Sequence, residues 1–215
     1  MNTQVGKMAD MHCHLAWVVL VVMLMGCREE VSPPETDLPW TYQERMSYER
    51  DGHVFSTTIV LEGTDQFPHE SVRAERYAQV QWAVAQAWFE WYGEDVYSCL
   101  GNVHVFVPQT DESFGFWCST DMPANRMGCT NPAGLHGVQP EFGWLTAIRR
   151  DHYEAPTEVL GLDIHIHELL HLAAHCARGD TLDDHPEEVF GLGVNYSVHY
   201  LARAFGGVGR GQPGR

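Results

Sequence analysis

The sequence is poor in cations. It has 13 lysine and arginine residues against 29 aspartate and glutamate residues, and the formal net charge of the 215-residue chain is −16. A surface with this excess of negative charge repels a phosphate backbone and an anionic lipid surface. We therefore expect no nucleic acid among the partners of this protein.

The apolar run near the N-terminus is too short to cross a bilayer. A membrane-spanning helix needs about 20 apolar residues, whereas residues 15–25 have the length of the hydrophobic region of a signal peptide. The run ends in Leu24-Met25-Gly26-Cys27, which resembles a bacterial lipobox. The resemblance implies that residues 1–26 are a lipoprotein signal peptide and that a lipid on Cys27 anchors the exported chain to a membrane. An ordinary secretory signal or a buried strand is the alternative.

The residue after the lipobox bears on localisation. Arg28 stands there instead of an aspartate. By resemblance to bacterial lipoprotein sorting, this implies the outer membrane or the cell surface.

The cysteines include no CxxC pair, which argues against a four-cysteine zinc site. If Cys13 leaves with the leader and Cys27 is acylated, four cysteines remain in an oxidising compartment: Cys99, Cys118, Cys129 and Cys176. Four cysteines allow three disulfide pairings, and the short separation favours Cys118 with Cys129, which leaves Cys99 with Cys176. Four reduced thiols are the alternative.

The chain lacks internal repeats, and its length leaves room for one domain. Residues 27–50 are polar and contain three prolines, a composition typical of a tether. We expect residues 51–205 to form the domain and residues 206–215 to form a flexible tail.

The apolar pattern predicts an α+β fold. Residues 54–61, 103–107 and 144–149 are apolar and predict strands, and residues 109–143 carry weaker strand signals. Apolar residues at three- and four-residue spacing predict a long helix over residues 71–92. A second helix is predicted over residues 159–178, before Gly179, and a third over residues 186–204.

The second predicted helix carries the sequence His167-Glu168-Leu169-Leu170-His171, an HExxH motif. Histidines four positions apart lie on one helix face, where both imidazoles can hold one metal ion. A zinc ion lowers the pKa of its bound water, and Glu168 can take the proton of that water as it attacks a carbonyl. A histidine-rich structural helix without metal is the alternative.

This arrangement resembles the zincin metallopeptidases. The resemblance implies a backing helix at residues 71–92, a small twisted and mostly antiparallel sheet, an HExxH active-site helix and a C-terminal helix. It also implies Zn²⁺ as cofactor, His167 and His171 as zinc ligands, Glu168 as general base, and a protein or peptide as substrate.

Catalytic zinc usually has a third protein ligand. The metzincin position falls on Ala177, which cannot bind zinc, and the gluzincin position falls slightly beyond Glu187 and Glu188. We prefer His185, because Gly179 can end the helix and turn the chain back to the metal. Glu188 or Glu187 is the next choice, followed by Asp180 or no protein ligand. In the absence of metal, the same residues would serve as cap and first turn of the third helix.

Several residues are candidates for supporting roles at the metal site. Tyr196, His199 and Tyr200 of the third helix could stabilise a transition-state oxyanion, with Tyr196 as the first choice, or they could pack in the core. Asp163, Asp180 or Asp184 could hold the histidine ligands in position. We expect His175 to be structural or to support the metal ligands, and His165 to be a surface or core histidine.

The leading hypothesis is therefore an extracytoplasmic zinc-dependent endopeptidase. The alternative is a noncatalytic surface lipoprotein that binds zinc through the same histidines.

Overall fold

The computed structural model describes residues 40–63, 70–118, 125–136, 144–154, 158–191 and 197–208. The chain divides into two units, Met1–Asp37 and Leu38–Arg215, and all described residues belong to the second. The expected signal peptide, Cys27, Tyr196 and residues 209–215 of the expected tail lie outside the described residues.

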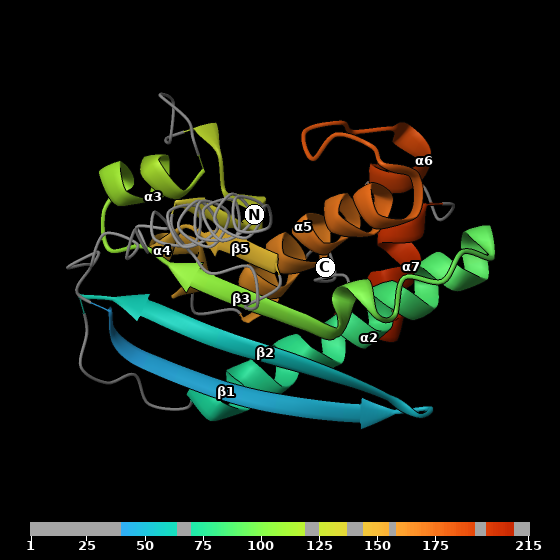
Figure 1. Cartoon of the computed structure of the whole chain (residues 1–215), viewed down its shortest axis with the longest axis horizontal. Helices are drawn as coiled ribbons and strands as arrows, with labels where there is room; N and C mark the ends of the chain where they lie inside the picture. The colour runs from blue at the N-terminus through green and yellow to red at the C-terminus, as the bar shows by residue number, and fades with distance from the viewer. Residues whose placement is uncertain are drawn as a thin grey trace, which may run out of the picture. The chain divides into compact units, whose positions relative to one another are not determined.

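A five-stranded sheet forms the centre of the described unit, in the order β1-β2-β3-β5-β4 (Figure 1). The strands are β1 Trp40–Arg50, β2 His53–Glu62, β3 Asn102–Val107, β4 Gly128–His136 and β5 Trp144–Ile148. Three of them confirm the predicted strands. The expectation of a mostly antiparallel sheet is wrong, because β2, β3 and β5 run parallel and only the two outer pairings are antiparallel.

The parallel pairing of β2 and β3 follows from their connection. The long helix α2, Glu70–Tyr92, lies between them in the chain and returns it to the same end of the sheet. The last eight residues of β2 are all buried. Such a continuous buried run is typical of a strand that is covered on both faces.

The expected tether is wrong over residues 40–50, which form β1 and pair with β2 along their length. Asp51 and Gly52 join the strands with φ values of 54° and 81°, the conformation that a tight two-residue hairpin requires. Residues 44–49 alternate between half-buried and exposed. This edge strand carries polar residues on its outer face, and its overall composition therefore resembles that of a tether.

The described residues contain six α-helices: α2, α3 Asp111–Trp117, α4 Arg150–Tyr153, α5 Glu158–Arg178, α6 Glu187–Phe190 and α7 Val198–Phe205. Helices α2 and α5 confirm the first two predicted helices, and they share the main hydrophobic core with β2 and β3. On the opposite face of the sheet, α3 packs Phe114 and Trp117 against alternate strand residues such as Val60 and Phe106. None of the described helices is both long and apolar enough to cross a membrane.

Two predictions for the loops and the C-terminal part need correction. Helix α3 lies where weak strand signals were expected, and Thr110 caps it by accepting a hydrogen bond from the Ser113 amide. The predicted helix over residues 186–204 is not continuous. Helix α6 ends at Gly191, whose ψ of 99° is not helical, and α7 starts only after Ser197, which caps it.

Candidate metal centre

Helix α5 presents the HExxH motif at the edge of the core. Leu169, Leu170 and Leu172 are fully buried on its inner face, and the helix packs against β4 and β5. The helix ends at Gly179, which has a φ of 74° and whose amide donates to the carbonyl of His175. A glycine in this left-handed conformation ends the helix and reverses the chain.

The structure brings the three preferred histidines together. The Nε2 atom of His167 lies 3.0 Å from Nε2 of His185 and 3.2 Å from Nε2 of His171. The ligand atoms of all three residues lie within 4.8 Å of one another, close enough to hold one metal ion. His185 thus returns to the HExxH helix as expected.

Two histidine side chains contact backbone carbonyls of the loop after α5. Nδ1 of His185 lies 2.8 Å from the carbonyl oxygen of Asp183. When Nδ1 donates its proton there, Nε2 keeps the lone pair that a metal needs. Nδ1 of His175 makes a similar contact of 2.9 Å with the carbonyl of Asp180. His175 thus contacts the start of the loop and is not part of the histidine cluster.

Phe190 of α6 packs against all three imidazoles, with ring centroids 4.4 to 4.9 Å away. Burial, aided by repulsion from the neighbouring histidines, lowers the pKa of His171 to about 3 and that of His167 to about 4. Both imidazoles are therefore neutral at pH 7, the form that binds metals.

Glu168 of α5 is buried on the side of the helix that faces β4, and 5% of its surface is exposed. The hydroxyl of Thr130 in β4 donates to its Oε2 and to its backbone carbonyl, both at 3.0 Å. Burial raises the pKa of Glu168 to about 8, although the Thr130 hydrogen bond and the charge of Arg126 both lower it. The neighbouring imidazoles and this carboxylate share one site.

Gly128 allows β4 to approach the motif. A Cβ atom at this position would lie 2.8 Å from Oε1 of Glu168 and 2.7 Å from Ile164. Sequence reasoning missed Gly128, Thr130, Arg126 and Phe190. A glycine within a strand can indicate a close approach of the backbone, and this was the one signal available for these residues.

The three histidines and Glu168 line a cavity of about 620 Å³. One wall is the segment 125–131, which includes the start of β4, and another is the loop with Leu182, Asp183 and His185. Asp163 and Ile164 of α5, His199 of α7 and Cys118 complete the described lining. The cavity is therefore open beside the motif and large enough for several side chains of a ligand.

The other candidate residues fall in different places. Glu188, the alternative ligand, is exposed and acts on the pKa of Tyr92, and it is not part of the histidine cluster. That alternative is therefore not supported. Tyr200 is exposed and is not among the described residues that line the cavity.

His199 faces the site. It is only 1% exposed, and its ring centroid lies 6.2 Å from that of His167. Its Nε2 lies 3.7 Å from Oδ1 of Asp163, which Arg203 also approaches at 3.0 Å. Burial lowers the pKa of His199 to about 4. Of the three aromatic candidates, His199 is the described one that the fold brings to the cavity.

The two expected cysteine pairs lie at disulfide distance. The Cα–Cα distance is 6.4 Å for Cys99 and Cys176 and 5.6 Å for Cys118 and Cys129. The first pair joins the end of α5 to the segment before β3. The second pair joins the end of α3 to β4 and is part of the cavity wall.

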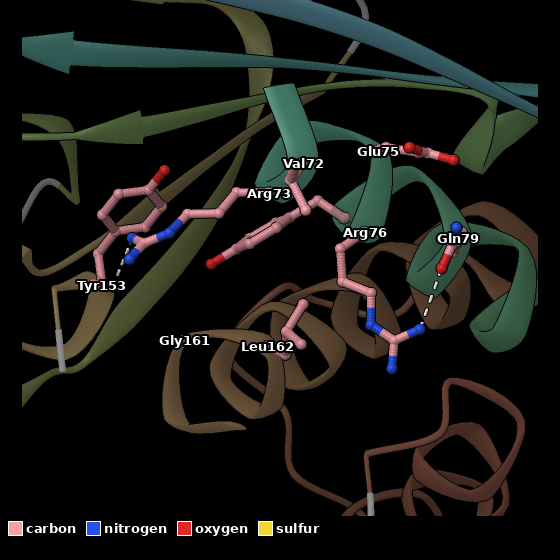
Figure 2. Close-up of a pocket in the computed structure, with 9 residues that line it drawn as sticks. Val72, Arg73, Glu75, Arg76, Gln79, Tyr153, Gly161 and Leu162 are labelled. Atoms are coloured by element: carbon pink, nitrogen blue, oxygen red, sulfur yellow. Dashed lines mark hydrogen bonds between the residues drawn. The ribbon is translucent and has the colours of Figure 1, made fainter. Parts of the chain in front are cut away.

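A smaller cavity of about 220 Å³ lies between α2 and the start of α5 (Figure 2). Arg73 donates to the carbonyl of Tyr153 at 3.0 Å, and Arg76 donates to Gln79 at 3.0 Å. Its described lining contains neither histidine nor cysteine. The chemistry-bearing residues thus gather in the larger cavity.

No protein-family model, no curated protein and no solved structure matches this chain. The geometry of the site is therefore the basis for any statement about its chemistry.

Proposed function

We propose that this protein is an extracytoplasmic zinc-dependent hydrolase and that its substrates are proteins or peptides. The observation that carries the proposal is the convergence of three imidazole nitrogens beside the carboxylate of Glu168, in one cavity. His167, His171 and His185 are the ligands, and Glu168 is the general base.

The donor set fits zinc. The three imidazoles each offer one ligand atom, and these atoms lie within 4.8 Å of one another, so that neutral imidazoles can direct three lone pairs at one cation. Imidazole is a good ligand for zinc, and three protein ligands with one open position are typical of catalytic zinc sites. Phe190 covers one side of the imidazoles, while the cavity leaves the other side accessible.

The chemistry divides between the ion and the protein. A bound zinc ion supplies Lewis acidity, which makes water a better nucleophile and polarises a carbonyl. Burial raises the pKa of Glu168 to about 8, and a cation held by the three histidines would lower it again. In its carboxylate form, Glu168 accepts the proton of the attacking water and then protonates the leaving amine. Thr130 holds one carboxylate oxygen of Glu168 in place. His199 lines the same cavity, and we assign it the donation of a hydrogen bond to a developing oxyanion.

Two features of the fold support a peptide substrate and the zincin resemblance. The long helix α2 precedes β3, β4 and β5, and the HExxH helix α5 follows these strands, which agrees with the order that the resemblance implies. Strand β4 is an edge of the described sheet, and its first residues line the cavity. An edge strand offers unpaired backbone groups to an extended peptide.

The proposal includes export and anchoring through Cys27. Both cysteine pairs at disulfide distance support it, because such pairs form and persist outside the cytoplasm.

The test combines zinc content with hydrolysis of a randomised peptide mixture by the full-length protein. We expect about one zinc ion per wild-type chain and a loss of zinc in His185→Ala. Glu168→Gln should keep zinc but lose about 10³-fold in kcat/KM, because it removes the general base. Glu188→Gln is the matched control, since that exposed glutamate lies outside the cluster, and it should keep both properties.

Two outcomes contradict the proposal. A wild-type protein that neither contains zinc nor takes it up has no metal centre. A protein that binds zinc but hydrolyses no peptide is the noncatalytic zinc-binding lipoprotein instead.

A further inference from the structure

Arg126 is the one lysine or arginine among the described residues that line the histidine cavity. It lies two positions before Gly128, on the wall beside the motif, and 40% of its side chain is exposed. Its charge lowers the pKa of both Glu168 and His171. A positive charge thus stands in the cavity close to the proposed reacting groups.

Arg126 forms an exposed ion pair with Asp183. Nη2 of Arg126 lies 3.3 Å from Oδ1 of Asp183, whose side chain is 78% exposed. Ion pairs with this exposure contribute little to stability. A guanidinium group binds a carboxylate through two parallel hydrogen bonds, and a carboxylate from a ligand can therefore replace Asp183.

We propose that Arg126 binds a carboxylate of the substrate, so that the site prefers peptides with an acidic group near the scissile bond. This inference rests on the proposed peptidase function and names its substrate class. The carboxylate can belong to an acidic side chain or to the C-terminus of the peptide. Because the chain carries a net charge of −16, its overall field repels such peptides. A preference for acidic peptides would therefore indicate a cation within the site.

The structure also supplies the competing explanation. The carbonyl of Asp183 accepts a hydrogen bond from His185, so the ion pair could serve only to hold the loop that carries this ligand. In that case, breaking the pair from either side has the same effect. Arg126→Gln and Asp183→Asn are therefore a matched pair of variants that separates the two explanations.

The experiment uses zinc-loaded full-length protein and two mixtures of short randomised peptides, identical except for a central glutamate or glutamine. Each mixture is made with a C-terminal carboxylate and with a C-terminal amide. We expect wild type to cleave the glutamate mixture about 10-fold more efficiently in kcat/KM, the low end for a hydrogen bond to a charged group. If the terminal carboxylate is the recognised group, the same preference appears between carboxylate and amide.

The two variants distinguish substrate recognition by Arg126 from a purely structural ion pair. Arg126→Gln should bring the ratio of the two kcat/KM values close to one, whereas Asp183→Asn should keep or increase it, because it frees the guanidinium. The inference is overturned if wild type shows a ratio of one in both comparisons, or if both variants lower the ratio alike. Zinc content of each variant shows whether loss of His185 from the metal is the cause.

A binding measurement distinguishes this inference from the proposed function. If wild type cleaves neither mixture, the hydrolase proposal fails, and fluorescence anisotropy of labelled peptides tests recognition alone. Tighter binding of the acidic peptides that Arg126→Gln abolishes supports recognition by Arg126 without hydrolysis. Equal binding of both mixtures overturns the inference together with the function.

Discussion

At the scale of single residues, the position of the Glu168 carboxylate depends on Thr130. These side chains lie 38 positions apart in the sequence and 3.0 Å apart in the fold. The opposite residue in β5 is Thr146, whose hydroxyl is buried and has no hydrogen-bond partner among the described residues. The same residue type thus occurs twice at one register position: Thr130 is bonded to the Glu168 carboxylate, and Thr146 is unbonded among the described residues.

This pair yields a matched prediction. Thr130→Val keeps the shape of the side chain but leaves a buried carboxylate without its donor, and kcat/KM should fall about 10-fold, because a hydrogen bond to a charged group is lost. Thr146→Val should keep activity and raise the free energy of unfolding by up to about 1 kcal/mol, since it removes an unsatisfied hydroxyl. Peptide hydrolysis and denaturant unfolding measure both. Full activity in Thr130→Val would contradict the role of this hydroxyl.

The positions of the candidate site residues could be predicted from the sequence where their spacing is local. Helical periodicity places His167, Glu168 and His171 on one helix, and Gly179 allows the return to His185. Thr130, Gly128 and Arg126 could not be predicted, because their roles depend on how β4 lies against α5. Phe190 was hidden in the same way, since nothing in its own segment indicates contact with the histidines.

At the scale of elements, a cysteine pair and an ion pair hold the end of α5 to the rest of the fold, in addition to its apolar packing. Cys176 lies at disulfide distance from Cys99, and Arg178 pairs with Glu94 at 3.1 Å. Cys129 and Cys118 make the corresponding link at the start of β4. One link therefore holds the HExxH helix, and the other holds the strand that faces it.

Removal of each cysteine pair should have a different effect on stability and activity. In the loop-entropy model, the 77-residue separation of Cys99 and Cys176 makes Cys99→Ser/Cys176→Ser cost roughly 4 kcal/mol of unfolding free energy. The 11-residue separation of the other pair predicts roughly 3 kcal/mol for Cys118→Ser/Cys129→Ser. The second variant should lose more activity, because Cys129 lies between Gly128 and Thr130. Denaturant unfolding and kcat/KM measure the two effects, and the reverse order in either contradicts this assignment.

The elements that could be predicted are the most buried ones. Strands β2, β3 and β5 and helices α2 and α5 contribute to the core and carry continuous or periodic apolar patterns. Strand β1 was missed because only one of its faces is covered. The C-terminal helix was predicted as one because apolar residues continue in the sequence beyond Gly191, where α6 ends.

At the scale of the whole molecule, the proposed metal centre connects the core to the loop after α5. His167 and His171 belong to a helix that is packed on the sheet, whereas His185 belongs to a segment without regular secondary structure. A ligand that binds only the folded state adds its binding free energy to folding.

Removal of the metal should therefore lower the melting temperature. With free zinc at 1,000 times Kd, the ion contributes about 4 kcal/mol, and a chelator should lower Tm by about 10 °C for a domain of this size. The Tm of His185→Ala should not respond to the chelator, while Glu168→Gln should respond as wild type does. Differential scanning calorimetry measures the shift, and a wild-type Tm that is independent of chelator would contradict a structural contribution of the metal.

The spacing of the site residues along the chain also has a consequence for folding order. His167 and His185 are 18 positions apart, whereas Glu168 and Thr130 are separated by 38 positions and meet only after β4 has joined the sheet. Short loops close at a lower entropic cost and earlier than long-range strand contacts. We therefore expect a folding chain to bring together the three histidines that we propose as metal ligands before Thr130 reaches Glu168, the proposed base. If the protein is the hydrolase that we propose, such an intermediate would hold its metal but lack an oriented Glu168, and it would therefore be inactive until β4 has joined the sheet.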